Sequence, residues 1–313
     1  MKVLIAYDGS RCSEAALDDL VSAGLPESCE ALVISVAEVW LPPPDGDGNI
    51  TGTRLQLESG RSNPEPYETD KRIVAGAETL AYHANKRLRQ MFPRWQVTAQ
   101  ATFGSPAWSI LKCADEFKPN LIVVGAHGSS PISRFFLGSI SQKVVTEAHC
   151  SVRVSRGRIE VDSVPVRIVI GFDGSKGSLA AVDEVASRPW RDYSEIRLIA
   201  ATKDVRPSAI GRFIPPAAHM VEEVNESERQ CIEKLAANPL IGLQRKNISA
   251  ALHFCAGNPK HVLVEQAENW NADCIFVGAN AFASRLERFL LGSTSAAVAA
   301  RAHCSVEVVR REA

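Results

Sequence analysis

Apolar and polar positions alternate in blocks along this chain, and each block predicts one element of secondary structure. Runs of β-branched and other apolar residues predict strands at 2–8, 30–38, 95–103, 120–125 and 151–155. Between these runs, apolar residues recur at the three-and-four spacing of a helix face. Two such faces consist of Ala16, Leu17, Leu20 and Val21, and of Ile140, Val144, Val145 and Ala148. Strands that alternate with helices in this way predict βα units and a mostly parallel sheet.

The whole pattern occurs twice. The segment VLIAYDGSRCSEAALDDL, which begins at Val3, matches IVIGFDGSKGSLAAVDEV, which begins at Ile168. Near the end of each copy, RFFLGSISQKVVTEAHCSVRV matches RFLLGSTSAAVAARAHCSVEV. Repeats of this length are whole domains and not the short units of a solenoid. We therefore predict a first domain at 1–157, a linker at 158–164 and a second domain at 165–313.

One segment does not fit this scheme. Residues 41–70 hold five prolines and four glycines, a composition that predicts no regular structure. The segment leaves the carboxyl end of the second predicted strand, on the edge where α/β folds bind ligands. We expect either a partly ordered flap, which would cover that edge or strap the domains together, or simple disorder.

Composition and charge narrow the class of protein. The 313 residues are about twice the usual domain size. Lys and Arg total 35 against 36 for Asp and Glu, so no net positive field favours nucleic acid or an anionic membrane. No apolar run approaches the roughly 20 residues that span a bilayer, and the N-terminus is typical of a first strand. The eight cysteines occur singly, which predicts a reduced, cytoplasmic setting.

The segment GAHGSSPISRFFLGS, directly after the buried run LIVV, carries the most specific pattern in the chain. Gly125 ends the predicted strand and Gly128 follows a short loop, at points where a side chain would intrude on a ligand. Gly138 and Ser139 open the next helix. The unpaired N–H groups and positive dipole end of that helix, with the hydroxyls of Ser139 and Ser141, predict a phosphate site.

In spacing and residue type, Gly125-x2-Gly128-x9-Gly138-Ser139 is similar to the motif of nucleotide-binding members of the universal stress protein family. The segments DGS after the first strand, GSP before the third helix and HCSVRV at the end of the first copy support the resemblance. It covers nearly the whole chain twice, except for 41–70, the linker and a stretch near 204–230.

The resemblance implies that the first half binds ATP together with Mg²⁺. By this resemblance, Asp8 contacts the ribose, the backbone of Val36 holds the adenine, and Arg134 neutralises phosphate charge. The full set of expected ATP-binding residues is Asp8, Val36, Gly125, Gly128, Arg134, Gly138, Ser139, Ile140 and Ser141.

The second half departs from the motif. Gly278 aligns with Gly125, but Ala281 stands where glycine is expected, and Gly292 arrives one residue late. We predict that the late arrival shifts the loop relative to the helix N-terminus. The result is a degenerate site with far weaker ATP binding, formed by Asp173, Gly278, Ala281, Gly292 and Ser293, in which Asp173 and Ser293 keep only local roles in a turn and a helix cap.

Other catalytic or metal-binding interpretations are weaker. Lys176 is misplaced for a P-loop, and the sequence after Asp45 lacks the glycine and glutamate of a calcium loop. His127, Asp8 and Ser139 could share a cleft as a hydrolytic triad, but a serine at a helix start is normally a cap or a phosphate ligand. The pairs His149-Cys150 and His303-Cys304 are interpreted as helix-end packing and not as metal or redox sites.

The resemblance implies two tandem doubly wound α/β domains of the adenine nucleotide alpha hydrolase-like type. Each has a five-stranded, mostly parallel sheet in the order 3-2-1-4-5, and the final strands join the halves into an intramolecular pseudo-dimer that we expect to pair again as a homodimer. The implied function is a nucleotide-dependent stress-response regulator, with an unidentified protein partner and at most slow ATP hydrolysis. The alternatives are an interaction scaffold that binds no nucleotide and an ATP-consuming transferase of the same fold.

Overall fold

The computed structural model describes residues 1–38, 65–127, 137–156, 165–202, 215–246, 248–279 and 291–310. The first half contains β1 (Lys2–Ala6), α1 (Arg11–Asp19), the short 3-10 helix η1 (Leu20–Ser22), β2 (Glu30–Ala37), α2 (Glu65–Met91), β3 (Gln96–Phe103), α3 (Pro106–Phe117), β4 (Leu121–Gly125), α4 (Ser139–Glu147) and β5 (Ser151–Ser155). The second half contains β6 (Arg167–Gly171), α5 (Lys176–Ser187), β7 (Glu195–Thr202), α6 (Pro215–Gln244), β8 (Ser249–Ala256), α7 (Pro259–Asn269), β9 (Cys274–Gly278), α8 (Ser293–Arg301) and β10 (Ser305–Val309). No helix among these described residues is long and apolar enough to cross a membrane.

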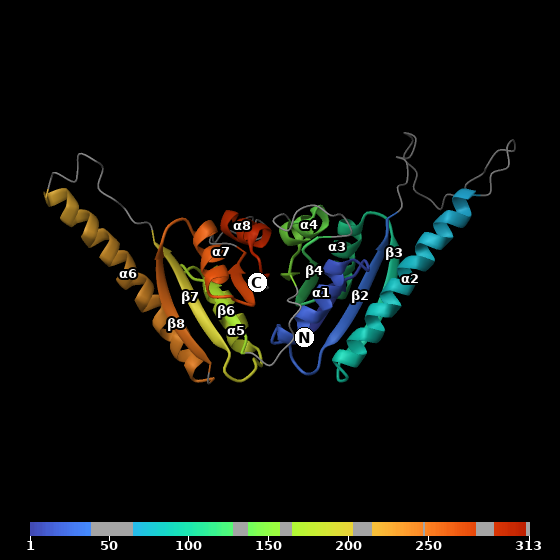
Figure 1. Cartoon of the computed structure of the whole chain (residues 1–313), viewed down its shortest axis with the longest axis horizontal. Coiled ribbons are helices and arrows are strands. Elements are labelled where there is room, and N and C mark those ends of the chain that lie inside the picture. The colour runs from blue at the N-terminus through green and yellow to red at the C-terminus, as the bar shows by residue number, and fades with distance from the viewer. Residues whose placement is uncertain are drawn as a thin grey trace.

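The strands form one ten-stranded sheet in the order β3-β2-β1-β4-β5-β10-β9-β6-β7-β8. Each half therefore has the predicted 3-2-1-4-5 order, and its strands are parallel. The two halves lie side by side in the molecule (Figure 1). They join through β5 and β10, which pair antiparallel with Arg153 opposite Glu307. This join confirms the predicted pairing of the two final strands.

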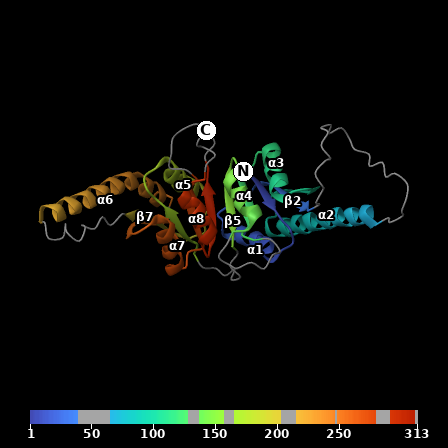
Figure 2. The same ribbon diagram turned by 90° about the horizontal axis from the view of Figure 1, so that it is seen from above.

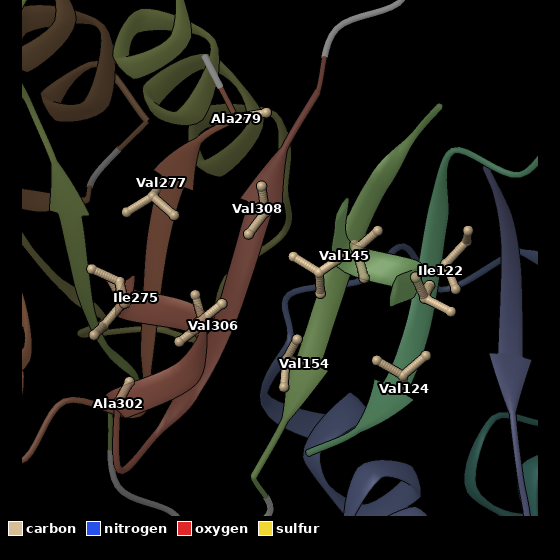
Figure 3. Packing of buried hydrophobic residues seen from close by; sticks show 14 of the residues in the cluster. Ile122, Val124, Val145, Val154, Ile275, Val277, Ala279, Ala302, Val306 and Val308 are labelled. Carbon is tan, nitrogen blue, oxygen red and sulfur yellow. The ribbon is translucent and has the colours of Figure 1, made fainter. Parts of the chain in front are cut away.

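Successive side chains of a strand point to opposite faces of the sheet, so each strand contacts helices on both faces. Val3 and Ile5 on β1 face one side of the sheet, where they pack with residues of α1 and α2. Leu4 faces the other side, in a cluster formed with residues of α3 and α4. That second cluster continues without a break into the other half, where Val306 and Val308 of β10 belong to it (Figure 3). One face of the sheet thus has a core that both halves share.

Local signals at the helix starts explain where the helices begin. Ser10 precedes α1, and its side chain accepts a hydrogen bond from the Ser13 N–H at 3.2 Å. Ser175 caps α5 in the same way at 3.2 Å. Helix α3 begins with Pro106, a residue suited to the first helical position because that N–H has no helical partner. These starts lie at the carboxyl edge of the sheet.

The start of α2 corrects one prediction. The segment 41–70 was expected to lack regular structure, but α2 begins at Glu65, so its last six residues are helical. The physical reason is that Glu65–Asp70 contains no glycine, and its proline lies in the first turn, where a helix tolerates it. Residues 41–64 lie outside the described residues. Helices α2 and α6 lie at opposite ends of the molecule (Figure 2).

Candidate functional site

A cavity of about 560 Å³ opens at the carboxyl edge of the first half. The ends of β1, β2 and β4 and the first turns of α3 and α4 surround it. Every expected site residue of this half that the structure describes lines the cavity: Asp8, Val36, Gly125, Gly138, Ser139, Ile140 and Ser141. Gly128 and Arg134 lie outside the described residues. The lining also includes residues that sequence reasoning did not assign to a ligand, among them Tyr7, Glu38, Pro106 and Ile110.

The start of α4 forms one end of the cavity. Gly138 is the N-cap residue in an extended conformation, and no side chain caps the helix. The Gly138 N–H donates to the Ala126 carbonyl at 2.8 Å, which fixes the helix start against the end of β4. The N–H groups of the first turn then point toward the cavity side of α4 with no helical acceptor. This arrangement suits an anion.

The two serines of α4 have different roles. Ser139 lines the cavity at the helix start. The buried Ser141 hydroxyl donates to the Gly125 carbonyl at 2.6 Å, and Ser295 does the same to Gly278 in the second half at 2.6 Å. The Ser141 proton is therefore committed to joining α4 to β4. Any contact between this hydroxyl and a ligand would use its oxygen as an acceptor.

The close approach that requires glycine at position 125 is internal to the fold. A Cβ at Gly125 would lie 2.9 Å from the Cys12 carbonyl carbon and 3.1 Å from the Ser13 nitrogen. At Gly278, the same Cβ would lie 2.3 Å from the Gly177 carbonyl carbon. Packing of β4 against the start of α1 therefore explains this glycine, and the expected intrusion on a ligand is not needed to account for it.

Asp8 and Val36 lie at the other end of the cavity. The Asp8 Oδ1 accepts from the Ser10 N–H at 3.0 Å, which turns the chain and ends β1 at Ala6. Ile34 accepts from the Tyr7 N–H at 3.0 Å, so its peptide groups face β1. Peptide groups two residues apart on a strand point the same way, so those of Val36 point past the end of β1 toward the cavity. This places a backbone donor and acceptor where a planar base could pair.

His127, Asp8 and Ser139 do line one cavity, but they form no hydrogen-bonded triad. The His127 Nε2 is buried without a hydrogen-bond partner. Burial, and secondly the charge of Arg156, lowers the pKa of His127, so the ring is neutral at pH 7. A nucleophile needs a base that is hydrogen-bonded to it and oriented by a third group. No such arrangement joins these three residues.

The described residues offer no preformed metal centre. They contain no group of three or more His, Cys, Asp or Glu side chains that could hold a metal ion. His149 lies 4.0 Å from Asp115, and His303 lies 3.6 Å from Glu268. Both histidines thus have a carboxylate neighbour on a helix that packs beside the helix they follow, α3 for His149 and α7 for His303, in keeping with a packing role.

The second half keeps the geometry of the helix start. The Gly292 N–H donates to the Ala279 carbonyl at 2.7 Å, and α8 begins at Ser293 as α4 begins at Ser139. The extra residue lies between Ala279 and Gly292 and leaves the helix start in place, whereas the loop at 280–290 lies outside the described residues, so its predicted shift stays a prediction. Asp173 accepts from the Ser175 N–H at 2.9 Å, the turn role expected for it. The cap role expected for Ser293 is wrong, because Gly292 is the N-cap residue and no side chain caps α8. Ala281 lies outside the described residues.

A polar cluster behind the cavity distinguishes the first half. The Tyr7 hydroxyl donates to Glu14, Arg87 of α2 donates to Glu14 and Asp18, and His83 lies 3.6 Å from Glu14. In the second half, Phe172 and Leu179 stand at the positions of Tyr7 and Glu14, within an apolar cluster. The aligned repeats carry this signal, in the change from Tyr and Glu to Phe and Leu, but sequence reasoning did not use it.

Comparison with known proteins identifies relatives that match nearly the whole chain. The sequence profile of the universal stress protein family matches residues 1–156 and 166–310. A universal stress protein of Mycobacterium tuberculosis is 26% identical over 317 residues, which cover 99% of this chain and 97% of that protein. The crystal structure of a universal stress protein from Archaeoglobus fulgidus has a TM-score of 0.60 at 20% identity, covering 99% of this chain and 96% of that chain, and it shares the fold.

Proposed function

We propose, from the premise that this chain belongs to the universal stress protein family, that its first half binds ATP and that the bound nucleotide sets which protein partner it engages. The observation that carries this proposal is the cavity at the carboxyl edge of β1, β2 and β4. It has an uncapped helix start at one end and the backbone of Val36 at the other. Its volume of about 560 Å³ lies within the roughly 300–1,000 Å³ of small-molecule sites.

The lining fits an adenine nucleotide in one orientation. Apolar side chains of Ile34 and Ile110 flank the Val36 end and would contact the adenine ring. Asp8 lies on the lining near the Val36 end and would accept from the ribose hydroxyls. The first N–H groups of α4 would bind phosphate oxygens, with Arg134 adding positive charge. Each contact remains part of the proposal.

Mg²⁺ would enter with the nucleotide. The described lining has two carboxylates, Asp8 and Glu38, and both follow strands at the base end of the cavity, away from α4. Mg²⁺ keeps several waters and binds readily to phosphates. The ion would therefore be held mainly by the phosphates and would supply charge neutralisation there.

A regulatory role fits this site better than rapid catalysis. His127 is the histidine in the described lining, and it has no orienting partner on Nε2. Without a positioned base, the expected hydrolysis is slow at most. The scaffold alternative predicts no nucleotide binding, and the transferase alternative predicts ATP consumption that depends on a second substrate.

Replacement of Gly128 tests the proposal. Gly128→Val places a branched side chain in the expected phosphate loop and should weaken ATP binding more than tenfold, about 1.4 kcal/mol. Ala281→Val makes the matched change in the second half and should leave that affinity within about twofold. Calorimetric titration of the full chain with ATP and Mg²⁺ measures both. Unchanged affinity in a correctly folded Gly128→Val variant would remove the assignment.

A further inference from the structure

Two arginines occupy equivalent positions at the join between the halves. Arg156 follows β5 and Arg310 follows β10. The Arg156 Nη2 donates to the Ala299 carbonyl in the last turn of α8 at 2.7 Å. The Arg310 Nη2 donates to the Val145 carbonyl in α4 at 2.6 Å. Each arginine therefore caps the carboxyl end of a helix in the other half, where carbonyl groups have no helical partner and the dipole favours a cation.

Both guanidinium groups have donors that find no partner among the described residues. The Nε and Nη1 atoms of Arg156 and of Arg310 are buried without a hydrogen-bond partner. Burial lowers the pKa of each to about 10, so both remain charged at neutral pH. A buried donor without a partner destabilises the fold, and the cost is larger when the donor is charged. Such donors indicate a place where an anion gains several contacts at once.

Arg156 lies beside the cavity of the first half. Ser155 pairs with Gly125 in the sheet, and the Ala126 N–H donates to the Ser155 carbonyl at 3.2 Å. Arg156 directly follows Ser155 at the end of β5, and His127 directly follows Ala126 after the end of β4. His127 lines the cavity, its Nε2 is buried without a partner, and the charge of Arg156 acts on its ring. Two residues with unsatisfied nitrogen atoms thus follow neighbouring strand ends, and one of them, His127, lines the cavity.

We infer that His127 and Arg156 form an anion corner that attracts the terminal phosphate of a ligand in this cavity. The inference rests on the nucleotide site proposed above and adds to it a selectivity for polyphosphate over uncharged nucleoside. His127 contacts the anion from the cavity wall, and Arg156 supplies charge from behind it. Because the same guanidinium donates to Ala299, an anion at the corner is also coupled to α8 of the second half, which lies against α4 (Figure 1).

The pair of equivalent arginines supplies a matched control. Arg156→Gln and Arg310→Gln each remove a buried guanidinium and one cap across the join. Arg310 caps α4 itself, so any loss through a weakened α4 should be larger in Arg310→Gln. A loss through direct attraction of the anion should occur only in Arg156→Gln. The readout is the ratio of ATP affinity to adenosine affinity, because adenosine lacks the anion and reports the rest of the site.

Calorimetric titration of the full chain with ATP and with adenosine tests the corner. Arg156→Gln should lower the ratio about tenfold, and Arg310→Gln should leave it within about twofold. His127→Gln leaves both helix caps intact and should also lower the ratio of ATP affinity to adenosine affinity. This variant replaces Arg156→Gln in the test if Arg156→Gln does not fold. An unchanged ratio in Arg156→Gln, or in His127→Gln if that arginine variant does not fold, would overturn the corner. Equal losses in the two arginine variants would also overturn it. Failure of the unsubstituted chain to bind ATP would overturn the proposed function instead.

Discussion

Replacement of Arg153 by methionine should destabilise the chain strongly, because this guanidinium is the centre of a buried network of charges at the join. Arg153 is 1% exposed, and Glu307 opposite it is 0% exposed. Arg153 donates to both carboxylate oxygens of Asp19, at 2.7 Å and 3.1 Å, and to Glu307 at 3.3 Å. Arg188 completes the network with bonds to Glu307, one of them 3.0 Å long, and to the Ala23 carbonyl across the join at 2.9 Å.

The contacts of Arg153 determine how much stability its replacement should remove. Burial alone would lower the pKa of Arg153, but the charges of Asp19 and Glu307 outweigh it and raise the pKa, so the residue stays charged at any pH where the fold persists. Removal of one partner from a buried ion pair costs about 3–5 kcal/mol. Glu307 keeps Arg188 as a partner, whereas Asp19 loses both of its hydrogen bonds to Arg153. We therefore expect a cost at the lower end of this range, a loss of about 3 kcal/mol in the free energy of unfolding.

Urea unfolding, followed by far-UV circular dichroism and by tryptophan fluorescence, measures the loss. The control is Arg94→Met, which breaks the ion pair with Glu27, a pair exposed by 75% and 78%, and should change stability little. Asp19→Asn added to Arg153→Met should recover part of the loss, because it removes the carboxylate left without its partner. A loss below about 1 kcal/mol in Arg153→Met would refute the reasoning, as would a loss no larger than that of Arg94→Met.

Two further predictions concern the surroundings of the cavity. Deletion of residues 41–64 should leave folding intact and change the rates of nucleotide exchange, because the segment leaves the Val36 end of β2. If stopped-flow measurements give unchanged nucleotide on-rates and off-rates, the segment is a passive loop. The lowered pKa of His127 means that the unfolded chain takes up a proton there more readily. Stability should therefore fall as the pH drops below about 6.5, and less so in His127→Gln; equal falls in urea midpoints between about pH 8 and about pH 5.5 would contradict this.

The repeated pattern of strands and helices made two α/β domains with parallel strands predictable from the sequence. The strand order and the join between the final strands were implied by the resemblance to the universal stress protein family, and the structure confirms both. The position of Ser139 was also predictable, because glycine followed by serine at the start of a helical pattern marks a helix start. The prediction of this helix start depends only on residues that are close together in the sequence.

What the sequence did not predict depends on contacts between distant residues. Arg153 occupies the middle of an apolar strand, and nothing nearby indicates that its partner, Asp19, lies 134 positions away in the chain. The need for glycine at position 125 comes from the start of α1, more than a hundred positions earlier, and not from a ligand. The cluster of Tyr7, Glu14 and Arg87 likewise requires α2 to lie against α1. The extra residue before Gly292 does not displace the start of α8, because the hydrogen bond from the Gly292 N–H to the Ala279 carbonyl fixes that start to the end of β9.

The central claim is that one half of this chain binds ATP and the other does so far more weakly. Native mass spectrometry of the full chain, before and after addition of ATP with Mg²⁺, tests it most directly. We predict a mass increase of one nucleotide per chain. No added nucleotide mass would contradict ATP binding and favour a scaffold, and two equally bound nucleotides would contradict the difference between the halves.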